Sequence, residues 1–363
     1  MQIKSIQLQN FRNYESLSMD FSGGVNLLYG DNAQGKTNLL EAVFLAATTK
    51  SLRGSKDREI IRLGCGEAHI GASVVSHDFP HRVDIHLRKN KVKGVAIDGV
   101  PIRRSTELLG LIHVIAFCPD DLSMMKNGPS ERRRFLDMEL CQMDRIYCSN
   151  LANYNKVLAQ RNNLLKQIGG DMSLKDTVSV WDDQLAKYGS EIIRRRREFV
   201  ADLAPVVAKK HELLSGGKEQ LEIRYAADVN EDDLADKLKE SLSHDLFLRA
   251  TGNGPHRDDV DFSVNGRNVR LYGSQGQQRT TALSLKLAEI ELVRASVKES
   301  PVLLLDDVLS ELDRNRQLQL LSEIRDIQTI VTCTGMEEFV DRRSTEDSIY
   351  YVQEGTVEKK AAI

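Results

Sequence analysis

A glycine-rich loop near the start of the chain decides the fold: Gly30-Asp31-Asn32-Ala33-Gln34-Gly35-Lys36-Thr37. The loop has the form G-x-x-x-x-G-K-[ST], follows the apolar run at 25–29 and precedes a segment, 38–47, whose composition favours a helix. In this setting backbone N–H groups and the helix N-terminus converge on phosphate groups. We expect Lys36 to reach the β- and γ-phosphates of ATP and Thr37 to offer its hydroxyl to Mg²⁺. The loop therefore predicts a nucleotide-binding α/β domain.

A second motif ends a short apolar run far downstream. Residues 302–305 have the composition of a central parallel strand, and Asp306 and Asp307 follow them directly. Ligands bind at the carboxyl edge of such sheets, where Asp306 would hold Mg²⁺. Asp307 would orient or deprotonate the attacking water. An apolar run that ends in two aspartates is weak evidence alone, but together with the glycine loop it strongly predicts a nucleotide triphosphatase.

The spacing of these motifs predicts a nucleotide-binding lobe that is split by an insertion. Over the first hundred residues the pattern favours strands, including an alternating segment at 81–97 that leads to an Asp98-Gly99 turn. Between 132 and 214 apolar residues follow helical spacing, which predicts two antiparallel helices joined near 169–171. We therefore assign 1–115 with 252–363 to a discontinuous nucleotide-binding lobe, and 116–251 to an inserted, mainly helical lobe.

Strand and helix patterns return in the last third of the chain. They predict a strand pair with an Asn265-Gly266 turn, a helix at 277–297 and a final strand at 329–331. The inserted helices are too short for the long coiled-coil arms of chromosome-organising ATPases.

The composition of the 363 residues limits the functional classes. Hydrophobic residues make up 41% and charged residues 28%, as in ordinary globular proteins. The net charge of −3 lacks the basic excess of a small nucleic-acid-binding protein, so any DNA-binding surface must be local. No apolar run is long enough to cross a bilayer, and the start lacks the pattern of a secretory signal, so we expect a cytoplasmic protein that does not contact membranes.

A polar segment before the 277–297 helix supplies a third motif: Ser274-Gln275-Gly276-Gln277-Gln278. Alone it is an ordinary helix cap. Upstream of the Asp-Asp strand, however, it resembles the signature motif of ABC ATPases, whose serine and glycine bind the γ-phosphate held by a partner subunit. Residues 310–313 (SELD) resemble the D-loop of the same proteins. The resemblance implies that Ser274, Gly276 and Gln277 bind nucleotide only in an ATP-dependent homodimer, with Lys36, Asp307 and Ser274 as catalytic residues.

Five blocks, in order, resemble the RecF family of bacterial recombination mediators, and with it the ABC/SMC/Rad50-type P-loop ATPase heads. They are 8–14 (LQNFRNY), 117–122 (FCPDDL), 128–137 (GP followed by RRRFLD), 254–259 (GPHRDD) and 305–313 (LDDVLSELD). The resemblance runs nearly end to end. It implies ATP and Mg²⁺ as cofactors, and binding of double-stranded DNA and of junctions between single and double strands. It also implies cooperation with RecR, and indirectly with RecO and RecA, to load RecA in DNA repair, replication-fork maintenance and the SOS response.

Two departures from the wider ABC pattern bear on the rate of hydrolysis. Asp307 stands where transporters place glutamate, and no histidine follows the 329–331 strand, where the chain reads Thr332-Cys333-Thr334. The RecF family shares both features. We therefore predict a slow ATPase whose hydrolysis times a DNA clamp.

Several groups of basic residues are candidates for DNA contact. We select Lys50, Arg53 and Lys56 after the first helix, and Lys89, Lys91 and Lys93 in the strand region. Arg103, Arg104 and residues 194–197 are further candidates, although each group also fits a solvated face. The block 256–259 fits an internal salt-bridge corner, a contact between lobes, DNA or the nucleotide edge. The arginines at 132–134 stand at a helix start and fit equally well a contact with an acidic helix of the other lobe.

Three other functions compete with this interpretation. The ATPase subunit of a transporter is disfavoured by the length of the helical insertion and by the missing histidine. An ATP-gated nuclease would need a metal-binding domain, for which residues 314–363 leave little room. Another SMC-like chromosome-associated ATPase would need long coiled-coil arms.

Overall fold

The computed structural model describes residues 1–119, 121, 124–168, 172–334 and 347–360. Two compact units make up the chain: Met1–Leu122 with Glu289–Ile363, here the first unit, and Ser123–Ala288, the second unit. The sequence-based division placed 252–288 with the nucleotide-binding lobe. In the structure this segment groups with the second unit because strand β10 (Asp259–Val264) pairs with β9 (Leu221–Ala226).

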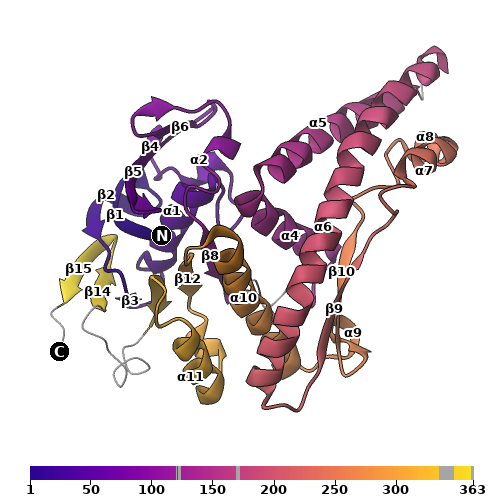
Figure 1. Ribbon diagram of the computed structural model, residues 1–363. Coiled ribbons are helices and arrows are strands. Elements are labelled where there is room, and N and C mark those ends of the chain that lie inside the picture. The colour runs from indigo at the N-terminus through magenta and orange to yellow at the C-terminus, as the bar shows by residue number, and fades with distance from the viewer. Residues whose placement is uncertain (120, 122–123, 169–171, 335–346, 361–363) are drawn as a thin grey trace. The chain divides into compact units, whose positions relative to one another are not determined.

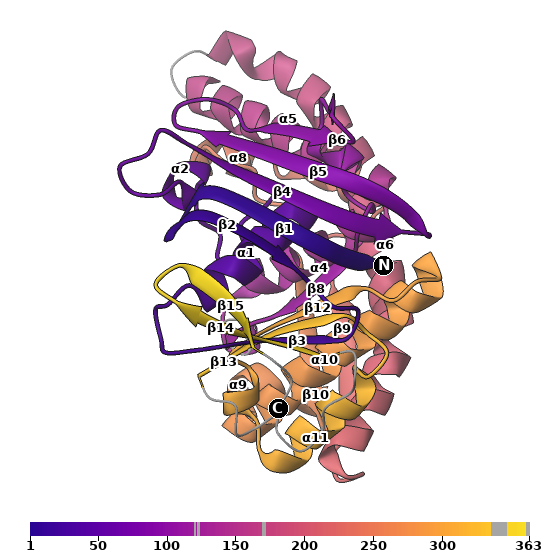
Figure 2. The ribbon, with the colours of Figure 1, turned by 90° about the vertical axis from the view of Figure 1, so that its left-hand side faces the viewer.

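An antiparallel sheet in the first unit is formed by six strands in the order β2-β1-β4-β5-β6-β7 (Figure 2). They are β1 (Gln2–Phe11), β2 (Tyr14–Asp20), β4 (Glu67–Ser76), β5 (Phe79–Arg88), β6 (Gly94–Ile97) and β7 (Val100–Pro101). Val83, Ile85 and Leu87 alternate inward along β5, as predicted. Asp98 and Gly99 have φ of 52° and 79° and make the predicted turn between β6 and β7.

A second sheet of the first unit carries the nucleotide motifs. Its order is β15-β14-β3-β13-β12-β8, and all neighbours are parallel except β14 and β15. The strands are β3 (Val25–Tyr29), β8 (Val114–Phe117), β12 (Val302–Asp306), β13 (Thr329–Cys333), β14 (Ser348–Gln353) and β15 (Thr356–Lys360). The predicted strands at 302–305 and 329–331 are confirmed, but the latter is not the final strand, since β14 and β15 follow it.

Helix α1 (Lys36–Thr48) lies between the two sheets and contacts strands of both. Its apolar residues face all directions, including Leu39, Leu40, Val43 and Phe44, which are buried. A helix that is hydrophobic all round must be covered on every side. The remaining elements of this unit are α2 (Asp57–Ile60), η1 (Ser105–Glu107), η3 (Leu309–Glu311) and α11 (Arg314–Glu323).

The second unit is built on long helices. Helix α5 (Arg145–Ile168) packs along α6 (Val178–Ser215), and α4 (Pro129–Met143) contacts both (Figure 1). The described part of 132–214 therefore holds three α-helices where the sequence predicted two helices, and the predicted joint at 169–171 lies outside the described residues. The other elements are η2 (Met172–Thr177), α7 (Leu234–Glu240), α8 (Leu242–Leu248), β11 (Arg267–Asn268) and α9 (Val269–Tyr272), and α10 (Gln275–Val297) begins in this unit.

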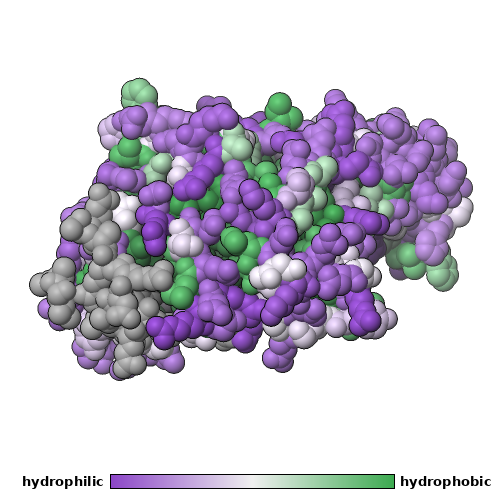
Figure 3. Space-filling view, turned by 60° about the horizontal axis from the view of Figure 1, so that its bottom comes forward, coloured by the Kyte–Doolittle hydropathy of each residue, from purple (hydrophilic) through white to green (hydrophobic). Residues whose placement is uncertain are grey.

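On the face drawn in Figure 3, hydrophobic residues lie in small groups that hydrophilic residues separate. Among the described residues, Leu63, Val92 and Phe247 are the most exposed large apolar side chains. In the part of the chain that the structure describes, no helix combines the length and apolar character that a membrane crossing requires.

Candidate active site

The glycine loop joins β3 to α1 in a conformation that needs its two glycines. Gly30 and Gly35 have φ of 148° and 120°, values that residues with a Cβ rarely adopt. A Cβ at Gly30 would lie 2.3 Å from the carbonyl oxygen of Val352, and one at Gly35 would lie 2.6 Å from Nδ2 of Asn13. Neighbouring segments therefore approach the loop so closely that no larger residue fits at either position.

Gln34, at the tip of the loop, is held by two segments from opposite ends of the chain. Asn13 Nδ2 donates to the Gln34 carbonyl oxygen at 2.9 Å, and the Gly355 amide donates to the same oxygen at 3.2 Å. The Glu354 amide donates to Gln34 Oε1 at 2.7 Å. Sequence reasoning missed Asn13, Glu354 and Gly355 as supports of the loop, because nothing near them in the chain indicates contact with residue 34.

Lys36 points back into its own loop. Its Nζ donates to the carbonyl oxygens of Gly30 at 2.5 Å and Asp31 at 2.8 Å. Burial lowers the pKa of the Lys36 ammonium, and the carboxylates of Asp307, Asp306 and Asp31 oppose this shift. The cation is thus held by carbonyl oxygens that an arriving anion can replace.

Thr37 and Asp306, the two residues expected to hold Mg²⁺, lie in contact. Thr37 Oγ1 donates to Asp306 Oδ1 at 2.7 Å, and Thr332 Oγ1 donates to the same oxygen at 2.9 Å. Mg²⁺ prefers hard oxygen ligands, and it commonly takes only one or two from the protein and the rest from water and phosphate. The hydroxyl of Thr37 and the carboxylate of Asp306 fit such a shared site. Among the described residues no cluster of three or more His, Cys, Asp or Glu side chains forms an all-protein metal site.

Asp307 stands at a sharp bend after β12. Its φ is 54°, in the left-handed region, and its amide donates to Thr332 Oγ1 at 2.9 Å. Ser310 Oγ donates to the Asp307 carbonyl oxygen at 2.7 Å. Thr332, on strand β13, therefore contacts both aspartates. Sequence reasoning noted only that no histidine follows this strand, and it assigned no role to Thr332.

The signature segment lies in the second unit and caps helix α10. Ser274 Oγ accepts from the Gln277 amide at 3.2 Å, and Gln277 Oε1 accepts from the Ser274 amide at 3.0 Å. This reciprocal pair is a capping box. The amides of Gln275 and Gly276 belong to the first helical turn, which has no intrahelical acceptors. The segment thus presents a serine hydroxyl and backbone donors together.

The block 256–259 forms an internal corner of the second unit. Asp258 is fully buried and accepts hydrogen bonds from the Tyr225 hydroxyl and the Asp228 amide, while Asp259 pairs with Arg132 at 2.6 Å. His256 Nδ1 lies 2.7 Å from the Tyr154 hydroxyl. Of the alternatives left open by the sequence, the salt-bridge corner describes these contacts. Arg132 lies in the same corner, while Asp120 and Leu122 of another family block lie outside the described residues.

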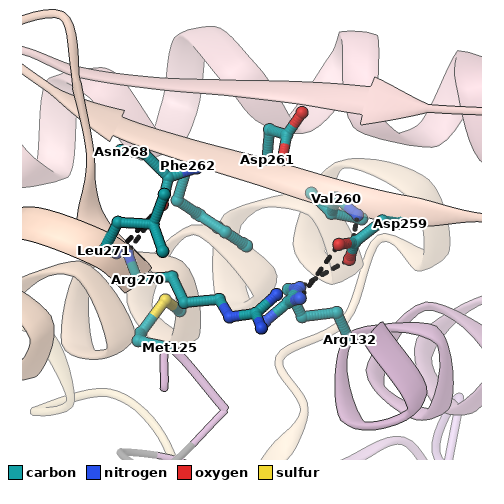
Figure 4. A pocket seen from close by; sticks show the side chains of 9 residues that line it. All are labelled: Met125, Arg132, Asp259, Val260, Asp261, Phe262, Asn268, Arg270 and Leu271. Atoms are coloured by element: carbon teal, nitrogen blue, oxygen red, sulfur yellow. Dashed lines mark hydrogen bonds and ion pairs between the residues drawn. The ribbon is translucent and has the colours of Figure 1, made fainter. Parts of the chain in front are cut away.

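A small pocket next to this corner is formed entirely by the second unit (Figure 4). Its volume is about 130 Å³, well below the roughly 300–1,000 Å³ of typical ligand sites. Asp259 and Arg132 pair at one end, and Arg270 lies beside Met125. The pocket is too small to be a nucleotide site.

Two of the candidate basic groups lie side by side. Lys93 Nζ donates to the Thr49 carbonyl oxygen at 2.6 Å and pairs with Asp57 at 3.0 Å, which joins the strand region to the loop after α1. Its ammonium is therefore engaged within the first unit. The other members are exposed: Lys50, Arg53, Lys56, Lys89 and Lys91, of which Arg53 also contacts Asn38 Oδ1 at 3.5 Å. Arg103 and Arg104 are exposed too.

The four arginines at 194–197 are ion-paired within the second unit. Arg194 pairs with Glu191, and Arg195 with Asp144 and Glu198. Arg196 is buried between Asp137 and Asp258, and Arg197 pairs with Glu231. Burial removes Arg196 as a candidate for DNA contact. The other three arginines pair near the surface, and 37–55% of each side chain is exposed.

Known families and proteins resemble the chain over nearly its whole length. The model of the family "RecF/RecN/SMC N terminal domain" matches residues 2–358. A "DNA replication and repair protein RecF" from Lachnoclostridium phytofermentans is 62% identical over 359 residues, which cover 99% of this chain and all of that protein.

Solved structures give the same result for the fold. A structure of "the recombination mediator protein RecF-ATP in RecFOR pathway" superposes with a TM-score of 0.93 at 36% identity, and covers 99% of this chain and 97% of the other. An Smc head domain from Pyrococcus furiosus, at 15% identity and a TM-score of 0.58, covers 99% of this chain and 95% of its own and shares the fold. The chain has the ABC/SMC-type ATPase head fold, and it belongs to the RecF family of DNA replication and repair proteins.

Proposed function

We propose that this chain is a cytoplasmic, ATP-dependent DNA-binding recombination mediator. It dimerises when Mg–ATP binds, holds double-stranded DNA near single-strand gaps and, with RecR, promotes the loading of RecA. The observation that carries the proposal is the group formed by Lys36, Thr37, Asp306 and Asp307 at one end of a parallel sheet. The family, and the RecF structure solved with ATP, support the same assignment.

The loop residues Gly30 to Thr37 would bind the phosphates of ATP. Lys36 would exchange the carbonyl oxygens of Gly30 and Asp31 for β- and γ-phosphate oxygens. Thr37 and Asp306, now hydrogen-bonded to each other, would hold Mg²⁺, which when bound neutralises phosphate charge. Thr332 would keep Asp306 oriented through its hydroxyl.

Asp307 would orient the attacking water and accept its proton. The neighbouring Lys36 ammonium favours the ionised carboxylate that this role requires. The aspartate side chain is one methylene shorter than glutamate, and the bend at φ 54° fixes its backbone. On this basis we propose slow hydrolysis. The bound nucleotide would then hold the dimer together for longer than it does in a fast ATPase.

Ser274, Gly276 and Gln277 would complete the site of a second copy. The Ser274 Oγ already accepts from Gln277, so its hydrogen remains a donor for an anion. The open amides of the first turn of α10 and the helix dipole also favour a phosphate group. A chain on its own would then bind ATP without the contacts that drive turnover.

Light scattering with ADP, with Mg–ATP, and with Mg–ATP plus a DNA duplex tests the proposal. We expect the mass to double only with ATP, and the doubled mass to persist longer in Asp307→Asn, which blocks turnover. Ser274→Arg should bind ATP but remain a monomer. A mass that does not depend on nucleotide would contradict the proposal.

The exposed lysines of the β5–β6 region would contribute to DNA contact. Each phosphate contact adds about 0.9 to the slope of log affinity against log salt for duplex DNA. We expect Lys89→Glu with Lys91→Glu to weaken duplex binding and to lower that slope by about 2. The control is Lys237→Glu with Lys239→Glu, an equal change of charge on exposed positions of α7 in the second unit. Equal losses in both variants would show a net-charge effect and remove this patch from the proposal.

A further inference from the structure

A chain of hydrogen bonds joins the signature segment to the end of helix α6. The Ser274 amide donates to Gln277 Oε1 at 3.0 Å, and Gln277 Nε2 donates to Glu219 Oε1 at 3.0 Å. Glu219 Oε2 lies 3.1 Å from His211 Nε2, and His211 Nδ1 lies 3.1 Å from Ser284 Oγ. Residues 277 and 284 are two turns apart on one face of α10. Glu219 and His211 therefore hold the first turns of α10 from the side.

The hydrogen bonds of His211 place a hydrogen on its Nε2. A carboxylate only accepts, so Nε2 donates to Glu219. On the other side of the ring, Ser284 Oγ lies 3.1 Å from His211 Nδ1 and 2.7 Å from the Thr280 carbonyl oxygen. His211 is fully buried, and the Glu219 side chain is 23% exposed.

The carboxylate also decides which way the Gln277 amide points. Because Glu219 Oε1 accepts, the Gln277 NH₂ group faces it and Gln277 Oε1 faces the Ser274 amide. In the opposite orientation the NH₂ group would face the N–H of Ser274, and two donors would meet. The orientation seen here holds the backbone of Ser274 in the capping box, with the serine hydroxyl available to donate outward.

A hydrogen bond holds two groups in a fixed direction, because the donor must point at the acceptor. Here Glu219 and His211 lie directly behind Gln277, the residue that orients Ser274. We propose that Glu219 and His211 are positioning residues for the signature motif: they orient Gln277 so that Ser274 is preset to bind the γ-phosphate held by a second copy of the chain. This inference rests on the ATP-dependent dimer of the proposed function.

Replacement of Glu219 by lysine tests the inference, because it puts a hydrogen-bond donor in the place of the carboxylate acceptor. The introduced ammonium would donate both to Gln277 Oε1 and to a neutral His211, which turns the Gln277 amide over. The side chain at position 219 is 23% exposed, so the ammonium also reaches solvent. Glu219→Gln is the conservative variant: its oxygen accepts from Gln277, and its NH₂ group donates to the neutral ring. The matched control is Glu222→Lys on β9, whose side chain is 54% exposed and pairs with Arg224 on the surface.

Two quantities are measured for each variant. One is binding of a fluorescent ATP analogue to the monomer at low protein concentration. The other is the dimer dissociation constant with Mg–ATP in an Asp307→Asn background, from light scattering. A symmetric dimer contains two signature contacts. For Glu219→Lys we expect unchanged binding of the analogue and a tenfold loss per contact, which is about a hundredfold in the dimer dissociation constant. Glu219→Gln and Glu222→Lys should dimerise like the wild type.

Several outcomes would overturn the inference. Wild-type dimerisation by Glu219→Lys, an equal loss in Glu219→Gln, or a parallel loss of monomer binding would each do so while leaving the proposed function intact. Failure of the wild type to dimerise with ATP would overturn both. Thermal melting checks the fold of each variant. If Glu219→Lys does not fold, Glu219→Ala takes its place. A smaller loss of dimerisation is then expected, because the Gln277 amide turns freely instead of being reversed. Wild-type dimerisation by Glu219→Ala would contradict the inference.

Discussion

The glycine loop of the first unit and the buried arginines of the second unit are both groups of charged residues, but they use charge differently. Lys36 donates to carbonyl oxygens of its own loop, six and five positions away. Arg161, in contrast, is fully buried and reaches Asp182 and Asp245, both at 2.6 Å, which are 21 and 84 positions away. The loop holds a cation ready for an incoming anion, whereas the arginine ties helices together.

The comparison teaches how to interpret charged residues in a sequence. A charge whose partners are local backbone groups is found in a short motif, and it remains available to a ligand. A charge whose partners lie far away leaves no motif. Arg196 shows this in the run at 194–197, which resembled a DNA-binding patch although Arg196 is buried against Asp137 and Asp258, 59 and 62 positions away. Variants that remove one charge from each region should therefore have opposite effects on stability and on activity.

The largest effect is expected for Arg161→Met. Methionine leaves the carboxylates of Asp182 and Asp245 buried without their cation. The loss of one partner of a buried ion pair costs about 3–5 kcal/mol. We expect a fall of this size in the free energy of unfolding of the second unit, followed in urea by the fluorescence of Trp181, the single tryptophan, on α6.

The control for this variant is Arg224→Met. Its side chain is 79% exposed and pairs with Glu222 on the surface, so its removal should change stability by less than about 0.5 kcal/mol. If both variants cost the same, buried and surface arginines would not differ in the way that the comparison requires.

Lys36→Ala should lower ATP hydrolysis strongly and stability only slightly, in contrast to Arg161→Met. Without the Lys36 ammonium, the negative charge that develops on the transferred phosphate group is stabilised by one hydrogen-bond donor fewer. The rate of ATP hydrolysis should therefore fall about 10²–10³-fold. The melting temperature should change by only a few degrees, because the Lys36 ammonium donates to backbone carbonyl oxygens of its own loop and not to a distant element. Steady-state release of phosphate and thermal melting measure the two effects, with the exposed Lys4→Ala as control. A collapse of the fold in Lys36→Ala would show that the loop, too, depends on its charge for structure.

The smallest effect is expected from the titration of His256. Burial lowers the pKa of His256, while its hydrogen bond to the Thr251 carbonyl oxygen and the charge of Asp228 oppose the shift, and Arg257 and Arg133 reinforce it. The unfolded chain then takes up the proton first as the pH falls through about 6.5, so this group's contribution to stability is present above that pH and is lost below it.

His256→Gln removes this titration but retains a donor for Thr251 and an acceptor for the Tyr154 hydroxyl. We expect the melting temperature of the variant to fall less than that of the wild type between pH 7.5 and 5.5. Identical slopes would mean that the buried ring does not contribute to the acid sensitivity of the second unit.

The accuracy of the sequence-based predictions followed the range of the interactions behind them. The strand before the loop, helix α1 and strand β12 were predicted because each has a local apolar pattern and clear end signals. Strands β14 and β15 were missed, although the turn between them supports Gln34. The boundaries of the two units also differed, since the pairing of β9 with β10 joins segments more than thirty positions apart.

The sequence by itself determined the glycine loop, the aspartates after β12, the capping segment at Ser274 and the family of the chain, because backbone geometry and short spacings encode these features. Only the tertiary structure decided that Thr332 contacts both aspartates, that Lys93 is engaged by Asp57, that the 256–259 block is an internal corner, and that Glu219 and His211 lie behind the signature segment. The physical reason is the same in each case: these contacts join segments whose meeting depends on the packing of the whole unit, and no local pattern in one chain records it.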